Sequence, residues 1–258
     1  MLLTDREQVI SDVCQDLFTR YMTRPTNTRL KASRSNINDL LLSCLFNRQV
    51  GWQKAMSIVP ELKRRAGMDD IIELLTTHTE PMIEWLMFAP ELGSKLHRFY
   101  YFASLARGCA LTIRDEYDGD ARNIFRGNSP DGTVTGTEAL NRVLKIKGFG
   151  TKTGSLYLRM AVLVYNLELW DGTMSLMPAN DRWVIRVGCQ LGLWDEDATF
   201  KQVCEVAKRL CISCPAALDS LFVIGTDWEC GTDNMACRGN GNSDGEECPL
   251  LGVCPSRQ

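Results

Sequence analysis

Apolar residues recur at helical spacing along almost the whole chain, and this periodicity constrains the fold more than any other feature. In residues 6–22 they form one stripe, and the helix must end before Pro25 because proline cannot continue it. We find no convincing strand alternation flanked by hairpin turns. The sequence therefore predicts an all-α fold, with loops at 118–137 and 231–247. Further helical stripes lie in residues 37–46, 52–66, 68–78, 82–89, 94–117, 137–146, 151–166, 181–194, 198–211 and 216–225.

The positive charge of the chain gathers in two places. The 258 residues carry a formal net charge of −3, so a polyanion would have to bind at a local patch. Residues 20–38 and residues 141–159 contain no acidic side chain. Each block is either a solvated face or a phosphate-binding surface, and the second coincides with a glycine-rich turn. The basic residues are Arg20, Arg24, Arg29, Lys31 and Arg34 in the first block, and Arg142, Lys145, Lys147, Lys152 and Arg159 in the second.

The composition also bears on the compartment. No run approaches the roughly 18 apolar residues of a membrane span, and the start MLLTDREQ lacks the order of a signal peptide. We therefore expect an intracellular protein that contacts no membrane, in the cytoplasm or nucleoid of a prokaryote. There the eleven cysteines are expected to be buried thiols or metal ligands, because disulfides are rare in that compartment.

The stretch KIKGFGTKTG, residues 145–154, joins two predicted helices through Gly148-Phe149-Gly150. Glycine adopts backbone angles closed to other residues and lets a ligand approach the main chain closely. The N–H groups of such a turn, and of the helix that begins near Thr151, attract an anion such as a phosphate. A plain helix–helix connection capped by glycine is the alternative, and the turn alone does not decide.

This stretch resembles the helix-hairpin-helix signature of the endonuclease III superfamily of DNA glycosylases. The resemblance places Lys152 at the position of the family's catalytic lysine, which is present in members that also cleave the DNA backbone. Lys147 stands where the family has a proline, which adds a possible phosphate contact. The resemblance implies DNA contacts at Lys147, Gly148, Gly150 and Thr151.

A second segment, PANDRWVIRVGCQLGL, resembles the family helix that begins at a catalytic aspartate, which here is Asp181. Arg182 and Trp183 replace the family's Thr-His, and Arg182 is expected to contact DNA. The separation between Lys152 and Asp181 is longer than usual, so Asp171 is a rival. Pro178 prevents a regular helix from starting at Asp171, and we therefore assign Asp181. A simple helix N-cap is the other reading of this aspartate.

Near the C-terminus, four cysteines follow the spacing C-x6-C-x10-C-x5-C. The family closes with C-x6-C-x2-C-x5-C around a 4Fe-4S cluster, so the outer spacings match and the middle one is longer. Four thiolates could also hold zinc, and the overall resemblance favours the iron–sulfur cluster. Arg238 would contact DNA from this loop, whereas Cys211 and Cys214 are read as core thiols. The expected ligands are Cys230, Cys237, Cys248 and Cys254.

The segment LLLSCLFNRQVGW resembles the family's helix-to-loop segment whose glutamine enters the gap left by an extruded base. This places Gln49 in that role, with Asn47 and Arg48 beside it as further DNA contacts. A solvated cap after an apolar helix is the alternative.

The resemblance to the family also implies a two-domain architecture. Residues 31–174 would form a helical barrel with the helix-hairpin-helix at about 140–165. Residues 1–30 and 175–258 would form the cluster domain, with the cluster loop at 230–254. The resemblance implies a monomeric base-excision DNA glycosylase that flips a damaged, mismatched or modified base out of double-stranded DNA. It also implies AP lyase cleavage through a lysine Schiff base. A monofunctional, hydrolytic glycosylase and a non-catalytic iron–sulfur DNA-binding protein are the alternatives.

Overall fold

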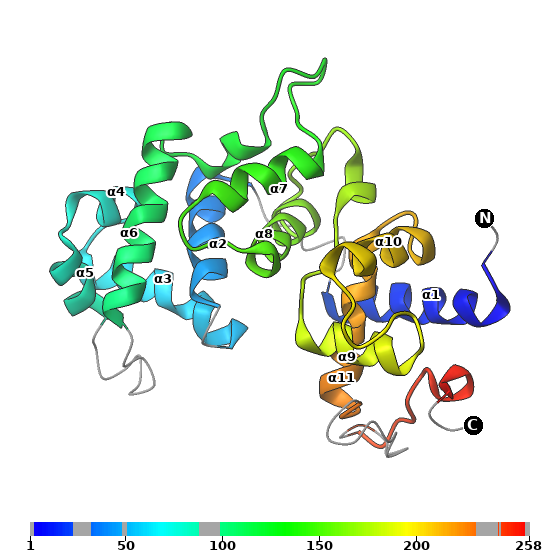
Figure 1. Ribbon diagram of the computed structural model, residues 1–258. Coiled ribbons are helices and arrows are strands. Elements are labelled where there is room, and N and C mark those ends of the chain that lie inside the picture. Colours follow the sequence, from blue (N-terminus) through cyan, green and yellow to red (C-terminus); the bar gives the residue numbers. More distant parts are fainter. Residues whose placement is uncertain are drawn as a thin grey trace. The chain divides into compact units, whose positions relative to one another are not determined.

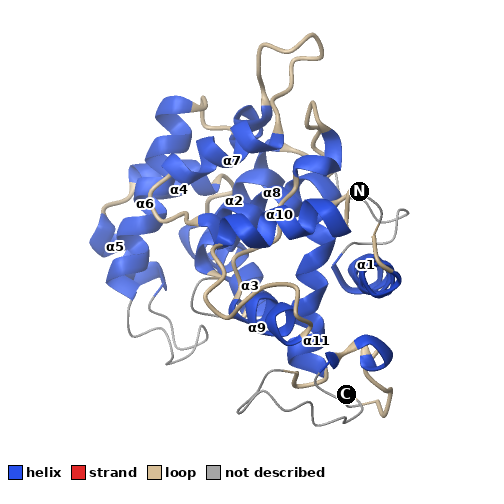
Figure 2. Ribbon diagram, turned by 45° about the vertical axis from the view of Figure 1, so that its right-hand side comes forward, coloured by secondary structure: helices blue, strands red, loops and turns tan. Residues whose placement is uncertain are grey.

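The computed structural model describes residues 3–22, 32–47, 51–87, 99–230, 242 and 244–255. These residues form α-helices joined by turns and short 3-10 segments, and a π-helical segment, Phe18–Met22, follows the first helix (Figure 1). Among them there is no β-strand (Figure 2). An isolated bridge joins Arg126 and Thr133. The prediction of an all-α fold is therefore confirmed.

The chain divides into two compact units. Unit 1 comprises Met1–Arg29 and Asp171–Gln258, and unit 2 comprises Leu30–Trp170. The first helix thus belongs with the C-terminal part of the chain. Within the described ranges no single helix is long and apolar enough to cross a membrane. One pair, Phe200–Leu210 and Pro215–Asp227, reaches that length and composition only together and is bent by 109°.

Unit 2 is arranged around the helix α2. Residues on nearly every side of α2 are buried, because it packs against α3, α4, α6 and α8. Such a helix, apolar all round, is typical of the centre of a domain. The α-helices in the described part of this unit are α2 (Arg34–Phe46), α3 (Trp52–Ala66), α4 (Ile71–Thr77), α5 (Glu80–Met87), α6 (Phe99–Glu116), α7 (Gly136–Lys145) and α8 (Thr151–Leu163).

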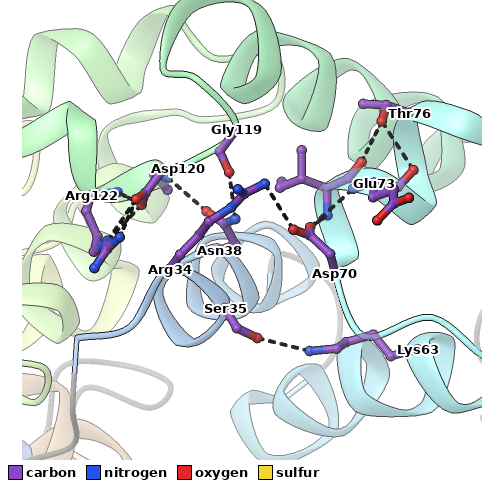
Figure 3. Close-up of polar contacts among 12 residues, drawn as sticks. Arg34, Ser35, Asn38, Lys63, Asp70, Glu73, Thr76, Gly119, Asp120 and Arg122 are labelled. Atoms are coloured by element: carbon purple, nitrogen blue, oxygen red, sulfur yellow. Dashed lines mark hydrogen bonds and ion pairs between the residues drawn. The ribbon is translucent and has the colours of Figure 1, made fainter.

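Polar side chains tie α2 to its neighbours (Figure 3). The amide of Asn38, which is 1% exposed, donates to the carbonyl of Gly119 at 3.0 Å and accepts from the N–H of Ala121 at 2.8 Å. Arg34 pairs at 3.0 Å with Asp70, the N-cap of α4. A buried backbone turn needs such partners, since unpaired polar groups are costly inside a protein.

The predicted loop at 118–137 is only partly a loop. Its first half contains a 3-10 helix, Ala121–Phe125, whose Ile124 and Phe125 side chains are buried. The second half ends at Thr135, the N-cap of α7. The polar, glycine-rich composition of the segment gives no sign of these buried residues. They are held in place by Asn38, which lies outside the segment.

Unit 1 is built around a buried 3-10 segment, Pro215–Ser220, against which α1 and α10 pack. Two helices start with a capping box, in which a threonine and the side chain three residues later satisfy each other's backbone N–H groups: Thr4 with Glu7, and Thr199 with Gln202. The α-helices in the described part of this unit are α1 (Asp5–Leu17), α9 (Arg182–Gln190), α10 (Phe200–Leu210) and α11 (Leu221–Asp227).

Glycines allow α9 to pack closely in unit 1. A Cβ added to Gly225 of α11 would lie 2.9 Å from the Trp183 ring of α9. On α9 itself, a Cβ at Gly188 would lie 1.9 Å from the ring of Trp194, whose Nε1 donates to the carbonyl of Ile185 at 2.8 Å. No other residue fits at either glycine without moving a tryptophan. These two contacts hold α9 against α11 and against the turn that follows α9.

Candidate nucleic-acid interface and metal centre

The glycine turn forms as predicted and joins α7 to α8. Ile146 ends α7, and the N–H of Phe149 bonds back to its carbonyl at 3.0 Å. Both of these side chains are buried. Gly154, one turn into α8, would place a Cβ 3.0 Å from Leu140, so the two helices approach closely. The apolar residues anchor the turn and leave its polar backbone at the surface.

The two glycines of the turn are required for different reasons. Gly148 has a φ of 96°, and a Cβ there would lie 2.7 Å from Leu45. Both the backbone angle and the packing therefore exclude other residues. Gly150 has an ordinary extended conformation, with φ of −112° and ψ of 179°, and a Cβ there would meet no atom within 4 Å. Nothing inside the protein requires a glycine at position 150.

The start of α8 is suited to an anion. Gly150 is its N-cap and supplies no side-chain hydrogen bond to the first turn. The N–H groups at the start of a helix carry partial positive charge and bind anions when no cap side chain occupies them. Thr151 is half-buried and Lys152 is exposed in that first turn. The structure therefore places Lys152 beside an anion-attracting helix start.

Lys147 lies against α6. Its stem fills the space that a side chain at Gly108 would take, since a Cβ there would be 2.9 Å from the lysine Cδ. Its ammonium donates to the Oγ of Ser104 at 3.4 Å, and the residue as a whole is exposed. The charge is thus held at the surface, on the same turn as Gly148 and Gly150.

The basic block at 141–159 is smaller than the sequence suggested. Arg142 pairs with Glu138 at 2.6 Å and donates to the carbonyl of Ile124 at 3.1 Å, so it serves the fold. Arg159 is buried, with 6% of its surface exposed. Neither of these two arginines therefore adds to an exposed basic surface. The block reduces to Lys145, Lys147 and Lys152, all of which are exposed.

In the first block, two arginines are also engaged in the fold. Arg20 pairs with Asp16 at 2.8 Å, and Arg34 pairs with Asp70 at 3.0 Å. The other three basic residues, Arg24, Arg29 and Lys31, lie outside the described residues.

The end of α2 lies beside the glycine turn, as the contact expected between Leu45 and a Cβ at Gly148 shows. Asn47 is the C-cap of α2 and is half-buried. Arg48 and Gln49 lie outside the described residues, so the predicted role of Gln49 stays a prediction. Asn47 precedes them directly and follows Leu45, whose side chain lies next to the turn, by two residues.

In unit 1, the helix predicted to start at Asp181 does so. Asp181 is the N-cap of α9, accepts from the N–H of Trp183 at 2.8 Å, and is 7% exposed. Its chain is fixed just upstream, where the carboxylate of Asp219 accepts from the N–H of Ala179 at 2.6 Å. The rival Asp171 precedes only a four-residue 3-10 turn, Gly172–Ser175. As predicted, an α-helix starts at Asp181 and none starts at Asp171.

Arg182 and Trp183, which stand where the resembling family has Thr-His, follow Asp181 directly. Trp183 packs against Gly225 of α11 and is half-buried. The guanidinium groups of Arg182 and Arg186 each lie 5.8 Å from the centroid of its ring. Both arginines are exposed, so the first half of α9 presents positive charge next to Asp181.

Among the expected metal ligands, Cys230 and Cys248 are half-buried and Cys254 is buried, all in unit 1. Cys237 and Arg238 lie outside the described residues. Within the described part of the chain no three Cys, His, Asp or Glu side chains are gathered to hold a metal. The Sγ of Cys230 does contact the side-chain amide of Gln190, at 2.8 Å from Oε1, and the amide nitrogen of Gln190 is buried without a hydrogen-bond partner. Rotation of the amide would bring that nitrogen to a negatively charged sulfur at Cys230, and thiolates are the donors that iron–sulfur clusters take.

The segments that carry these cysteines are tied to the rest of unit 1. Arg6 of α1 donates to the carbonyl of Val253, next to Cys254, at 2.9 Å, and also to the carbonyl of Leu191 at the end of α9. The indole of Trp228 donates to the carbonyl of Glu246 at 2.9 Å. Neither Arg6 nor Gln190 was a sequence candidate, because their partners lie far away in the chain.

In the remaining C-x2-C pair, Cys211 agrees with the prediction of a core thiol, whereas Cys214 is half-buried. Cys211 is fully buried, and burial raises the pKa of its thiol to about 12. Cys14 of α1 is equally buried, with a pKa also raised to about 12 by burial. Such thiols stay protonated and are poor metal ligands, because the thiolate is the form that binds a metal.

The described candidates therefore form two groups. Asn47, Lys147, Gly148, Gly150, Thr151 and Lys152 belong to unit 2, and Asp181, Arg182, Cys230, Cys248 and Cys254 belong to unit 1.

The fold is similar to that of several DNA glycosylases of known structure. A trapped endonuclease III–DNA covalent intermediate matches with a TM-score of 0.61 and 14% identity, over 99% of this chain and 97% of that one. A thermostable thymine-DNA glycosylase matches at 0.60 and 13% identity, over 97% and 96%. An 8-oxoguanine glycosylase/lyase from Clostridium acetobutylicum matches at 0.54 and 14% identity, over 84% and 68%. No protein-family model and no curated protein matches the sequence.

Proposed function

We propose that this chain, which has the two-domain helix-hairpin-helix fold of the DNA glycosylases, removes a base from double-stranded DNA. The observation that carries the proposal is the turn before α8. It has Gly148 at a φ of 96°, no side-chain cap on the helix, and Lys152 in the first turn. In a chain of this fold, that combination supports phosphate binding and a nucleophile at one place.

DNA binding would begin with the phosphates. Lys145 and Lys147 present positive charge at the turn, and the N–H groups of the first turn of α8 are directed outward. Contacts of this kind position a duplex whatever its sequence, and they weaken as salt rises because bound counterions are released. The turn would therefore hold the DNA, while the choice of base would lie with other residues.

The chemical step needs the target nucleotide outside the base stack, because its sugar is unreachable in a closed duplex. The neutral amine of Lys152 would attack C1′ of that nucleotide as the N-glycosidic bond breaks, and the base would leave with the bonding electrons and take up a proton. The adduct loses the amine proton, its C1′–O4′ bond opens, and O4′ takes up a proton, which leaves a Schiff base at C1′. Loss of a proton from C2′, with the electrons expelling the phosphate at C3′, would then cleave the strand.

Asp181 would stabilise the positive charge that develops on the sugar as the base leaves. Its burial and its hydrogen bond to the N–H of Trp183 fix the carboxylate at the start of α9. A fixed charge in a water-poor site stabilises a transition state more than a mobile one, because nothing has to reorganise during the reaction.

We also propose that Cys230, Cys237, Cys248 and Cys254 hold a 4Fe-4S cluster. Their spacing and the buried amide nitrogen beside Cys230 support this. The cluster would hold the C-terminal segment together, and Arg238, which follows Cys237, would contact DNA from it.

The test is a cleavage assay on duplexes that each carry one oxidised pyrimidine, 8-oxoguanine, mismatch or modified base, with borohydride added to trap a Schiff base. The wild type should release one of these bases and form a covalent adduct. Lys152→Ala should form no adduct, even on DNA with a pre-formed abasic site. Lys201→Ala is the matched control, because it removes the same charge from an exposed position of α10, outside the proposed DNA contacts, and should retain both activities.

Base release by Lys152→Ala at the wild-type rate would show that water is the nucleophile and that the enzyme is monofunctional. No release of any base by the wild type, with tight DNA binding, would identify a non-catalytic DNA-binding protein.

A further inference from the structure

The end of α9 contacts the first of the proposed cluster ligands. Gln190 is the last residue of that helix, and its Oε1 lies 2.8 Å from the Sγ of Cys230, forty residues further along the chain. In this arrangement the thiol of Cys230 donates and the amide oxygen accepts. Gln190 is 7% exposed, so the contact is made inside the protein.

The other end of the amide has no partner. The Nε2 of Gln190 carries two N–H donors, is buried, and makes no hydrogen bond. Buried N–H groups without an acceptor are rare in folded proteins, because water that bonded them in the unfolded chain has been lost. The side chain is thus in a position where its donors are not used.

A thiol at Cys230 needs a hydrogen-bond acceptor from this amide, whereas a metal-bound sulfur needs a donor. A cysteine binds a metal as the thiolate, which has no hydrogen to donate and attracts donors. The amide oxygen would then face a negatively charged sulfur. Rotation of the amide by 180° exchanges oxygen and nitrogen, and it directs an N–H at the sulfur instead.

We infer that Gln190 is a positioning residue for the metal centre, whose amide N–H donates to the sulfur of Cys230 when that sulfur is a cluster ligand. The inference rests on the cluster of the proposed function. Hydrogen bonds to ligating sulfurs delocalise their charge, stabilise the reduced form, and raise the reduction potential.

The surrounding packing keeps Gln190 at this sulfur. Trp183 packs against Gly225, which fixes α9 on α11, and Cys230 follows α11 after Trp228 and Glu229. Glu229 has a positive φ of 49°, so the chain turns sharply just before the cysteine. The contact between Gln190 and Cys230 is therefore set by two rigid helices.

The experiment compares two variants that lack a donor, Gln190→Met and Gln190→Glu, with one that restores a donor, Gln190→Lys. Gln8→Met is the matched control, since it makes the same substitution at an exposed residue of α1 in unit 1. Iron and acid-labile sulfide are measured first, then the reduction potential, then the rate of bleaching by an iron chelator. Circular dichroism checks that each variant is folded.

The two donor-free variants should have a more negative potential than the wild type and lose the cluster about 10- to 100-fold faster, as is usual when a partner of a metal ligand is removed. Gln190→Lys should restore the potential, and Gln8→Met should match the wild type. A folded Gln190→Met protein with the wild-type potential and bleaching rate would overturn the inference and leave the cluster in place. A wild type without iron and sulfide would overturn both, whereas the assay of Lys152 decides the glycosylase activity separately.

Discussion

The two glycines of the turn before α8 should respond to substitution in opposite ways. We expect Gly148→Ala to destabilise unit 2 and Gly150→Ser to leave its stability unchanged or slightly higher. We expect Gly150→Ser nevertheless to weaken DNA binding. The pair separates a glycine that the fold needs from one that a ligand needs.

The loss of stability expected for Gly148→Ala has two causes. An alanine with a φ of 96° has a strained backbone, which costs roughly 1–2 kcal/mol. Its Cβ would lie 2.7 Å from Leu45 and 3.3 Å from Leu105, and overpacking of this kind costs roughly 1–3 kcal/mol. Because the ends of leucine side chains can rotate away, we expect a total loss of about 2–4 kcal/mol in the free energy of unfolding.

At Gly150 neither cost applies, since the backbone is extended and the space is open. A serine is a slightly better N-cap than glycine, by a few tenths of a kcal/mol, because its hydroxyl accepts from the first turn of the helix. That hydroxyl would occupy an N–H that otherwise binds a phosphate. Loss of one hydrogen bond to a charged group costs about 1.5 kcal/mol, so affinity should fall about tenfold.

Unfolding by urea, followed by circular dichroism, measures the first effect. Fluorescence anisotropy with an undamaged duplex at two salt concentrations measures the second. Wild-type affinity in a stable Gly150→Ser variant would refute the argument, because the helix start would then not contact phosphate. Equal loss of stability in both variants would show that the turn is held in some other way.

Two further predictions concern carboxylates. Asp181→Asn should keep its helix cap, since asparagine caps as well as aspartate, while base release falls on the order of 10²- to 10³-fold; Asp171→Asn should stay active in the same assay. In α3, hydrogen bonds from Arg64 and then Arg65 lower the pKa of Glu61 from 4.5 to about 2. The stability that Glu61 adds is therefore present above pH 4.5 and is lost as the pH falls toward 2. The difference in unfolding free energy between the wild type and Glu61→Gln should disappear in that range, and a carboxyl carbon NMR titration should give the same pKa.

The sequence predicts the local features of the fold because local residues determine them. The start of α9 at Asp181 could be predicted because Pro178 excludes an earlier start and an aspartate caps well. The turn at Gly148 could be predicted because two glycines interrupt two helical stripes. In both cases the residues that fix the structure lie within a few positions of it.

The features that the sequence does not predict depend on distant partners. Arg159 looks like a surface charge within a basic block, and it is buried because α8 packs against both α2 and α7. Asn38 looks like a polar residue in a helix, and it holds a backbone turn eighty-one residues away. The contact between Gln190 and Cys230 has no local signal either, since each residue is ordinary in its own segment.

These distant contacts link the proposed metal centre to the proposed role of Asp181 at the start of α9. Gln190 lies nine positions after Asp181, about 13.5 Å along the helix at its usual rise. At the far end, Arg6 joins α1, the residue after α9, and the C-terminal segment through the carbonyls of Leu191 and Val253. A helix of this length is rigid, so whatever fixes its end also fixes its start. On this argument the cluster would act on base release by holding the carboxylate of Asp181 in place, and its loss would change activity without any electron transfer.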